Sequence, residues 1–408
     1  MIGSEAPRLP ALASRLGRAE TAAAVQMSTR AREMRAAGHN VISLAIGEPD
    51  FPTPALGIEA AHRAALDGLT KYPPVDGLPV LKAAVQRKFR RDQGLDFPLS
   101  QIMVTNGGKQ AIFNAFAATV DEGDEIVIPS PYWSSYALTA QVLGGVPVTV
   151  PCPANNGFRL RPEDLDAAIT ARTKWVVLNA PNNPTGAAYT AEQLAALAEV
   201  LRRHPHVWLF SDEIYEHLRY DGLGSISIAA VAPDLADRVL VMSGVSKTYA
   251  MTGWRIGFCG GPAGLIRAMV VMQSHATAGI STVGQAAAAA VLDGPQDVVG
   301  EMVAAYHRRR DLVVGMLRQA PGMTCAVPEG AFYVFPSIAG CIGRLSAGGQ
   351  PIDTDRDFAT ALLEEQHVAV VHGAAFGMSP YLRISYATDD ASLEDACRRI
   401  IEFCEALT

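Results

Sequence analysis

One lysine and one arginine stand in a stretch of apolar and small residues, VLVMSGVSKTYAMTGWRIGF, which runs from residue 239 to 258. A lysine is ordinarily a solvated surface charge. Here residues 239–242 have the pattern of a buried strand, and the GVS that follows is too small to shield a side chain. The stretch therefore indicates that another group approaches Lys247 and Arg255 closely.

Further groups that could do chemistry follow other apolar runs. Asp212 ends the run 207–212, and a carboxylate in that position is costly unless it meets a cation or a donor. Tyr215 comes three residues later and points the same way if a helix begins there. Asn183 lies in APNNPTG, where turn chemistry alone explains the composition. Taken singly, each of these residues has an ordinary structural explanation.

Two more features have both a structural and a functional explanation. Trp133 follows the run 125–129 and is either a core aromatic or a flat face on which a ring can stack. The GGK at 107–109 opens a predicted helix, and amides at a helix N-terminus bind anions. Because the residues around Lys109 do not match GxxxxGK[ST], an ordinary helix start is the better explanation of GGK alone.

These side chains share a position just beyond predicted strands. Between residues 100 and 260 short β-rich runs alternate with helical patterns, which predicts a mainly parallel sheet covered by helices on both faces. In such sheets ligands bind beyond the carboxyl ends of the strands. The predicted strands are 102–105, 125–129, 146–150, 174–179, 207–212, 239–243 and 255–260, and the predicted helices are 109–118, 134–143 and 191–203.

The last third of the chain changes character. A helical stretch covers 296–319, β-rich runs follow at 332–335, 368–371 and 381–385, and a helix is predicted over 390–406. We therefore expect an α/β chain with a second, smaller α+β domain. The predicted parts are 1–45, an N-terminal arm with part of the small domain; 46–295, the large cofactor-binding domain; and 296–408, the rest of the small domain.

Composition bounds the class of protein. Of 408 residues, 49% are hydrophobic and 18% charged, which is typical of a globular protein and excludes a disordered one. A net charge of −7 offers no attraction to nucleic acid or to anionic membranes. We see no secretory signal, membrane-spanning run or metal-ligand spacing, and the six scattered cysteines favour reduced thiols in the cytoplasm.

Taken together, the groups beyond the strand ends fit one cofactor, pyridoxal phosphate. Its aldehyde needs a lysine for a Schiff base, and its ring nitrogen needs a buried carboxylate in order to stay protonated. Its phosphate suits an arginine fork and helix amides, and its ring suits an aromatic partner. We therefore predict that Lys247 bonds the cofactor covalently and that Arg255 holds its phosphate.

The sequence resembles the class I and II aminotransferases of pyridoxal-phosphate fold type I, and within them the bacterial aspartate/prephenate branch. Ten motifs carry the resemblance and occur in family order from about residue 30 to the C-terminus: GEPDFPTP, KYPPVDGLPVLKAAV, TNGGKQAIFNAF, PSPYWSSY, NAPNNPTG, SDEIYEH, SGVSKTYAMTGWRIGF, PEGAFYVF, VAVVHGAAFG and YLRISYAT. One such motif is modest support, whereas ten in order are very specific. The resemblance implies a mainly parallel seven-stranded sheet in the large domain.

The resemblance also implies roles for single positions. Lys247 bonds the cofactor and shuttles the proton, and Asp212 partners the pyridine nitrogen. Tyr72 reaches the phosphate of the neighbouring subunit, which implies a homodimer with shared active sites. The other implied contacts are Asn183 and Tyr215 at the phenolic oxygen, Trp133 as the stacking ring, Gly108, Lys109, Ser246 and Arg255 at the phosphate, and Gly47 and Arg383 at the substrate α-carboxylate.

Three departures from the family pattern bear on the pocket. Relatives carry a threonine in a SAT-like stretch where this chain has ETAAAVQMS (20–28), Ala276 stands where a polar residue is common, and KYPP replaces KYTP. Lys109 favours an acidic substrate side chain; in the alternative it only tempers the phosphate charge, and Ala24 and Ala276 leave a roomier, less polar pocket. We expect aspartate or glutamate as donor, with oxaloacetate and 2-oxoglutarate as keto partners; aromatic or aliphatic amino acids are the alternative.

Two other kinds of protein have the same fold. A β-lyase or a cyclopropane-forming synthase has the same cofactor contacts, and only the resemblance favours transamination over them. A non-catalytic regulator carries an added DNA-binding domain, which we do not expect before residue 30, and it has no need of Lys247. The expected partners are therefore small molecules and a second copy of the chain.

Overall fold

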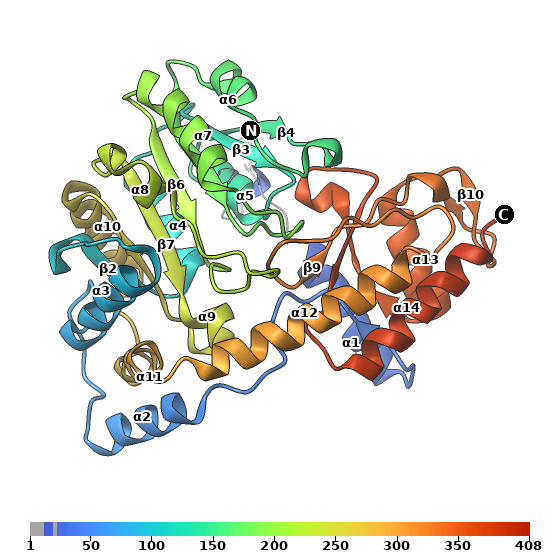
Figure 1. Cartoon of the computed structure of the whole chain (residues 1–408), viewed down its shortest axis with the longest axis horizontal. Helices are drawn as coiled ribbons and strands as arrows, with labels where there is room; N and C mark the ends of the chain where they lie inside the picture. The colour runs from blue at the N-terminus through green and yellow to red at the C-terminus, as the bar shows by residue number, and fades with distance from the viewer. Residues whose placement is uncertain (1–11, 19–22) are drawn as a thin grey trace, which may run out of the picture.

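The fold is built around one large sheet. The computed structural model of the chain describes residues 12–18 and 23–408, and Figure 1 shows this sheet between helices in one half of the molecule. Its strand order is β2-β8-β7-β6-β5-β3-β4. Strand β8 runs antiparallel to β2 and β7, and the other neighbours are parallel. The predicted α/β architecture with a mainly parallel seven-stranded sheet is therefore confirmed.

The strands of this sheet match the apolar runs that predicted them, with boundaries that differ by at most two residues. They are β2 (Ile102–Thr105), β3 (Glu125–Ser130), β4 (Val146–Pro151), β5 (Thr173–Asn179), β6 (Trp208–Asp212), β7 (Val239–Gly244) and β8 (Gly257–Gly260).

Successive side chains of a strand point to opposite faces of the sheet, and here the side chains on both faces are apolar. Helices therefore cover both faces. Leu209 and Val241 pack on one face, and Phe210 and Leu240 pack on the other. The first face is covered by α3 (Pro79–Gln93), α6 (Pro162–Ala168), α7 (Ala191–Arg203), α8 (Ile228–Val231) and α11 (Thr282–Asp293), with α2 (Ala55–Leu66) lying against α11. The second is covered by α4 (Gly108–Ala117), α5 (Ser135–Val142) and α10 (Ala263–Ala276).

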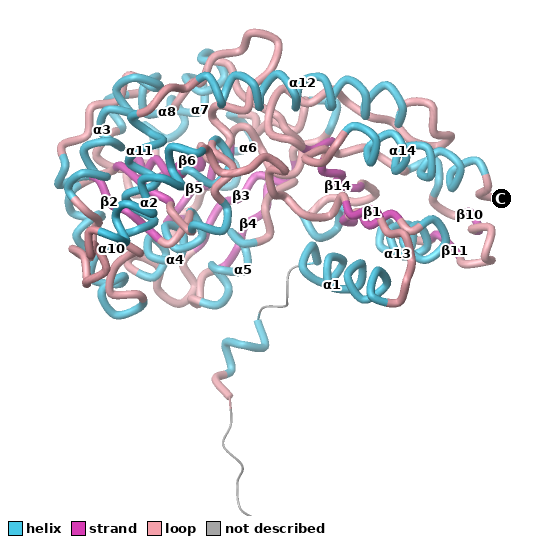
Figure 2. Tube along the Cα trace, turned by 90° about the horizontal axis from the view of Figure 1, so that it is seen from below, coloured by secondary structure: helices cyan, strands magenta, loops and turns pink. Residues whose placement is uncertain are grey.

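A smaller α+β part adjoins the sheet. In Figure 2 the long helix α12 (Asp297–Leu317) runs toward this part, which holds α1 (Ala23–Ala36), α13 (Asp355–Gln366) and α14 (Asp390–Glu405). Strands β9 (Tyr333–Val334), β13 (Val371–His372) and β14 (Leu382–Ser385) form an antiparallel sheet, and β10 (Arg344–Leu345) pairs with β11 (Pro351–Ile352). Strand β1 (Ile42–Ser43) lies parallel to β12 (Val368–Ala369), which brings the N-terminal segment into this part.

Several helices were not among the predicted elements, notably α2, α3, α10 and α13. In α3 the apolar periodicity is interrupted by Lys82 and Lys88, both of which are buried, so that the helix does not display a clean apolar stripe. The domain boundaries at 45/46 and 295/296 stay a prediction. Residues 1–11 of the proposed arm, and 20–22 of the ETAAAVQMS stretch, lie outside the described residues.

The two parts meet where β5, β6 and β7 end. Asn183, which follows β5, accepts a hydrogen bond from Arg383 of β14, and Tyr215, which follows β6, shares one with Tyr333 of β9. This junction is therefore the place at which side chains from both parts can converge on a ligand. No helix within residues 12–18 and 23–408 has the length and apolarity needed to cross a membrane.

Candidate active site

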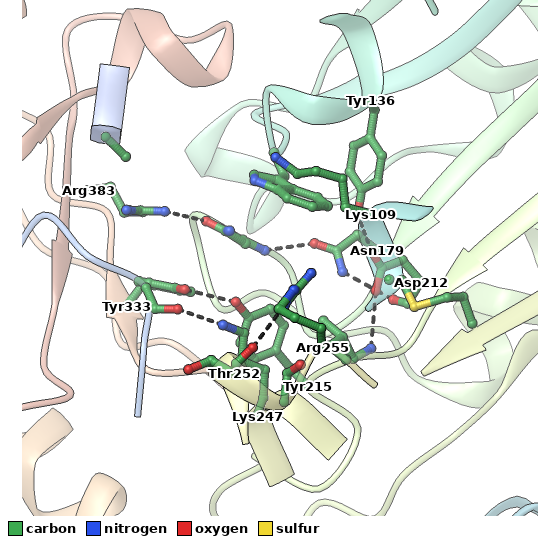
Figure 3. Close-up of a pocket in the computed structure, with 18 residues that line it drawn as sticks. Lys109, Tyr136, Asn179, Asp212, Tyr215, Lys247, Thr252, Arg255, Tyr333 and Arg383 are labelled. Carbon is green, nitrogen blue, oxygen red and sulfur yellow. Dashed lines mark hydrogen bonds between the residues drawn. The ribbon is translucent and has the colours of Figure 1, made fainter. Parts of the chain in front are cut away.

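A cavity of about 300 Å³ lies at the junction of the two parts, and Figure 3 shows the side chains around it. Of the residues singled out in the sequence, Tyr72 and Ala276 do not line it, whereas Ala24 and the other predicted cofactor and substrate contacts do. These contacts are Gly47, Gly108, Lys109, Trp133, Asn183, Asp212, Tyr215, Ser246, Lys247, Arg255 and Arg383.

Lys247 belongs to the short helix α9 (Val245–Thr248), immediately after β7. Its Nζ donates a hydrogen bond to the carbonyl oxygen of Gly47 at 2.6 Å. Burial lowers the pKa of Lys247 to about 8; Glu48 and Asp212 oppose this change, whereas Arg383 and Arg255 reinforce it. A larger share of the amine is therefore neutral near pH 7 than in a free lysine, and a neutral amine is the form that attacks a carbonyl carbon.

Asp212 ends β6 and is 1% exposed. Burial raises the pKa of its carboxyl to about 6, although the Tyr136 hydroxyl, the Ile214 amide and the charge of Lys247 lower it. Tyr136 donates to Oδ2 at 2.5 Å, and the Ile214 N–H donates to Oδ1 at 3.1 Å. The carboxylate thus has two neutral donors, and a cation that met it here would gain a strong interaction in a dry environment.

Tyr215 reaches the cavity from a turn over residues 214–217. The sequence predicted that Tyr215 would point toward the site if a helix began there. That helix does not form, because the Asp212 carboxylate accepts a hydrogen bond from the Ile214 amide in the manner of an Asx turn. The Tyr215 hydroxyl lies 2.8 Å from that of Tyr333. A Cβ at residue 47 would lie 2.1 Å from the Tyr333 hydroxyl, so that only glycine fits at Gly47 beside this pair of tyrosines.

Arg383 is buried between the rings of Tyr333 and Phe376, whose centroids lie 4.8 and 4.9 Å from its guanidinium carbon. It donates to Asn183 Oδ1 at 3.1 Å and to the Ala45 carbonyl oxygen at 2.5 Å. Its Nε is buried without a hydrogen-bond partner in the described part of the chain. A buried donor without a partner is costly, and a carboxylate ligand would supply the missing acceptor and charge.

The end of the cavity beside β8 suits a phosphate group. Helix α4 begins here, and its first amides have no carbonyl partner within the helix. Arg255 donates to the carbonyl oxygens of Thr252 and Asn106, at 2.9 and 3.2 Å. A Cβ at Gly257 would lie 2.6 Å from the Gly107 carbonyl carbon, so that glycine is required for β8 to approach this turn.

Lys109 extends across Trp133, with Nζ 5.3 Å from the centroid of the ring. Burial, and then the charge of Arg255, lowers the pKa of the Lys109 amine. Two cations thus face the same end of the cavity, a placement that an anionic ligand would stabilise.

These groups fit pyridoxal phosphate. The cavity offers an amine for the aldehyde, a buried carboxylate for the ring nitrogen, and a helix N-terminus with Arg255 for the phosphate. Arg383, with its Nε left free, then remains for a second anion such as a substrate carboxylate. The chemistry of the donors therefore agrees with the cofactor that the sequence predicted.

Ala276, exposed at the end of α10, does not line the cavity, so its expected effect on the pocket stays a prediction. Tyr72 does not reach the cavity either. Its side chain is 93% exposed and borders a surface hollow formed with residues 70–73 and 277–283. In a single chain it contacts none of the other site residues, so its role stays a prediction that depends on a second copy.

Several lining residues were missed in the sequence, namely Tyr136, Asn179, Ile214, Met242, Thr252 and Tyr333. Asn179 donates to the Asp212 carbonyl oxygen at 3.1 Å and accepts from the Asn183 amide at 2.8 Å, and so ties the ends of β5 and β6 together. Tyr136 and Tyr333 lie in the PSPYWSSY and PEGAFYVF motifs. The only signal for them was membership of those motifs, since nothing in the spacing indicates a contact with Asp212 or Arg383.

Comparison with known proteins agrees with this geometry over almost the whole chain. A profile of the family described as "Aminotransferase class I and II" matches residues 39–400. The chain belongs to this family. Its members use pyridoxal phosphate, and the large sheet with its smaller α+β partner is the fold type I architecture of these aminotransferases.

Individual relatives are similar in length as well as in sequence. The "Aspartate/prephenate aminotransferase" of Cereibacter sphaeroides is 52% identical, with 97% of this chain and 99% of that protein covered. The crystal structure of the aspartate aminotransferase of Rhizobium meliloti superposes with a TM-score of 0.95 at 49% identity, covering 98% of this chain and 100% of that one. The Thermus thermophilus aspartate aminotransferase with maleate gives 0.91 at 40% identity, covering 97% and 100%.

Replacing Asp212 by asparagine should stabilise the cofactor-free aminotransferase at high pH. The folded-state pKa of about 6 exceeds the unfolded value of ~3.9, so ionisation of the folded carboxyl costs on the order of 3 kcal/mol above pH 7 and nothing below pH 4. The amide keeps the shape, and the Tyr136 hydroxyl can turn to accept from it. Thermal unfolding should therefore show Asp212→Asn above wild type at pH 8, with the gap closing by pH 4.

A suitable control is Asp234→Asn, because the exposed Asp234 carboxylate pairs with Arg202, which lowers its pKa. That variant should show no gain at pH 8. A gain for Asp212→Asn that is equal at pH 4 and pH 8 would contradict the assignment of the cost to ionisation.

Proposed function

We propose that this aminotransferase transfers the amino group of aspartate or glutamate to a 2-oxo acid, with pyridoxal phosphate bonded to Lys247. The observation that supports this most is the shared cavity of Lys247, Asp212 and Arg383, in which Arg383 keeps an unpartnered buried Nε. A primary amine and a carboxylate-binding cation within one dry pocket suit the α-amino and α-carboxyl groups of an amino acid.

The cofactor, when bound, supplies an electron sink for the substrate α-carbon. In this proposal Asp212 keeps the ring nitrogen protonated, and Asn183 and Tyr215 donate to the phenolic oxygen. Trp133 stacks against the ring, while Gly108, Lys109, Ser246 and Arg255 hold the phosphate. The Lys247 amine would take the substrate α-proton and return it, a role for which a pKa of about 8 is well matched.

The substrate α-carboxylate would bind Arg383, whose planar fork suits two carboxylate oxygens. Gly47 lines the same pocket; its carbonyl oxygen already accepts from Lys247 Nζ, so a carboxylate would meet the backbone N–H of Gly47 instead. Since every amino acid has this carboxylate, Arg383 and Gly47 contribute affinity without selecting among side chains.

Selection of an acidic side chain is assigned to Lys109. Its ammonium lies over the Trp133 ring, and both side chains line the cavity. Relatives named for aspartate and prephenate, and a structure solved with maleate, all involve dicarboxylates. These names support a second cationic contact besides Arg383. Ala24 lines the cavity and favours the alternative of a less polar pocket, which the measurement below distinguishes.

We also propose a homodimer in the cytoplasm. The exposed phenol of Tyr72 and the hollow beside it suit contact with a second copy whose phosphate end it would complete. All six cysteines are buried and unpaired, which favours a reducing compartment.

The first expected outcome concerns the substrate. With 2-oxoglutarate as acceptor, kcat/KM should be higher for aspartate than for phenylalanine or leucine, and Lys109→Ala should remove most of this preference. The loss should reach about tenfold to a hundredfold, the effect of one charge-assisted hydrogen bond. Lys247→Ala should abolish turnover with every substrate, and Arg383→Lys should raise KM for all of them alike.

Steady-state kinetics of the wild type and these variants tests both the acidic substrate and the role of Lys109. A preference for aspartate that survives the loss of Lys109 would show that another group selects the side chain. Equal turnover of aspartate and leucine in wild type would contradict the acidic substrate.

The second outcome concerns assembly. Sedimentation velocity should give twice the chain mass of 43.3 kDa, and Tyr72→Phe should weaken pyridoxal phosphate binding about tenfold, because one donor to a charged group is lost. Binding of pyridoxal, which has no phosphate, should be unchanged by the same substitution. An active monomer, or an equal effect on both ligands, would contradict the assigned role of Tyr72.

A further inference from the structure

A buried polar network lies behind the candidate site, on the face of the sheet that α3 covers. Lys88 of α3 is only 1% exposed, and its Nζ donates to Glu216 Oε2 at 2.5 Å and to Gln93 Oε1 at 3.2 Å. The second oxygen of Glu216 accepts from the Ser243 hydroxyl at 2.5 Å. None of these four side chains lines the cavity, and the proposed chemistry uses none of them.

The network and the site occupy opposite faces of the same two strands. Because side chains alternate along a strand, Asp212 of β6 faces the cavity while Ser211 points away, where its hydroxyl donates to Glu213 at 2.7 Å. In β7, Met242 lines the cavity and Ser243 points away. Each of the two strands therefore presents one side chain to the cavity and a neighbouring side chain to the network.

Two chains of hydrogen bonds cross this network, and we call them relays. The first relay is Lys88–Glu216–Ser243. The second relay is Asp92–His217–Thr248, in which His217 lies 3.0 Å from Asp92 Oδ2 and 3.2 Å from Thr248 Oγ1. Both begin on α3 and pass through the segment that follows Asp212. The first ends on Ser243 of β7, in the strand that leads into the turn of α9 before Lys247, and the second ends on Thr248, which directly follows Lys247.

Stability alone is a poor explanation for these groups. A buried ion pair seldom gains more from its mutual attraction than it loses in desolvation. A third acid, Glu213, adds to the difficulty, because burial and then repulsion from Glu216 raise the pKa of its carboxyl to about 7. Lys88 and Glu216 lie in a dry interior, whereas the side chains of Asp92 and His217 are 11% and 19% exposed. Contacts that are shielded from water are directional and resist displacement, which suits them to fixing the separation of two segments.

We propose that the two relays are positioning devices, which hold the segment of Lys247 at a fixed distance from that of Asp212. The inference rests on the proposed function, since it takes the cofactor to span these two residues between its aldehyde carbon and its ring nitrogen. Lys88, Asp92, Glu216 and His217 then act through Ser243 and Thr248 and do not touch the ligand.

The test removes the far ends of the relays and leaves the buried charges paired. Ser243→Ala deletes one hydroxyl, and Thr248→Val deletes the other while keeping the branched shape. The matched control is Ser227→Ala, since Ser227 also donates a buried hydroxyl hydrogen bond, to Glu213 Oε1 at 2.7 Å, from outside both segments. Because the Ser227 hydroxyl also caps α8 by accepting from the Ala229 amide, Ser227→Ala should lose at least as much thermal stability as either of the other variants.

Two readouts separate positioning from simple destabilisation. The pH titration of visible absorbance in the cofactor-loaded protein should shift by at least about 0.5 pH unit in the Ser243→Ala/Thr248→Val double variant, roughly a threefold change in proton affinity. Its kcat for aspartate should fall about tenfold, with KM changed less than about twofold, as expected for a displaced reacting group. In the cofactor-free protein, amides 243–249 should exchange hydrogen faster than in Ser227→Ala.

The outcomes are distinguishable. A wild-type titration retained in the double variant, with stability lost as in Ser227→Ala, would show that the network is structural only. A wild-type protein that binds the cofactor without any pH-dependent visible band would overturn the proposed bond at Lys247, and the positioning role with it.

Discussion

The buried carboxylate of Asp212 is the constraint around which the site is organised. A parallel sheet covered on both faces has a dry interior, and burial at the end of β6 raises the pKa of this acid to about 6. Tyr136 and the Ile214 amide recover only part of the lost hydration. The hydration that is not recovered favours a ligand with a protonated nitrogen. Binding of that ligand would offset the free energy that burial of the Asp212 carboxylate costs in the isolated chain.

The other charged side chains of the site lie around the same cavity as the buried Asp212 carboxylate. Lys247, Arg255, Lys109 and Arg383 all line the same cavity, so the cavity wall carries more cationic than anionic side chains. Burial, reinforced by the charges of Arg383 and Arg255, lowers the pKa of Lys247. The same positive field would attract a phosphate at one end of the cavity and a carboxylate at the other. The site is thus electrostatically incomplete in the isolated chain, and a dianionic cofactor with an anionic substrate would complete it.

The sequence was sufficient for features that depend on local chemistry. Seven apolar runs predicted the sheet, and the anomalous polarity of Lys247 and Asp212 at strand ends predicted the two central residues of the cavity. It was insufficient where contacts join distant segments. Tyr136 meets Asp212 across 76 positions of sequence, and Tyr333 meets Tyr215 across 118. Helix α3 was not predicted because a lysine such as Lys88 is normally a surface residue. Its burial is explained only by Glu216, which is distant in the sequence and faces it in the structure.

The central claim is that Lys247 is the residue that bonds the cofactor. The most direct measurement is to incubate the protein with pyridoxal phosphate, reduce it with borohydride, digest it and locate the added group by mass spectrometry. The account predicts one phosphopyridoxyl group per chain, on the peptide that contains Lys247, and none in the Lys247→Ala variant. Stoichiometric modification of Lys109 or of another lysine, with Lys247 left unmodified, would contradict it.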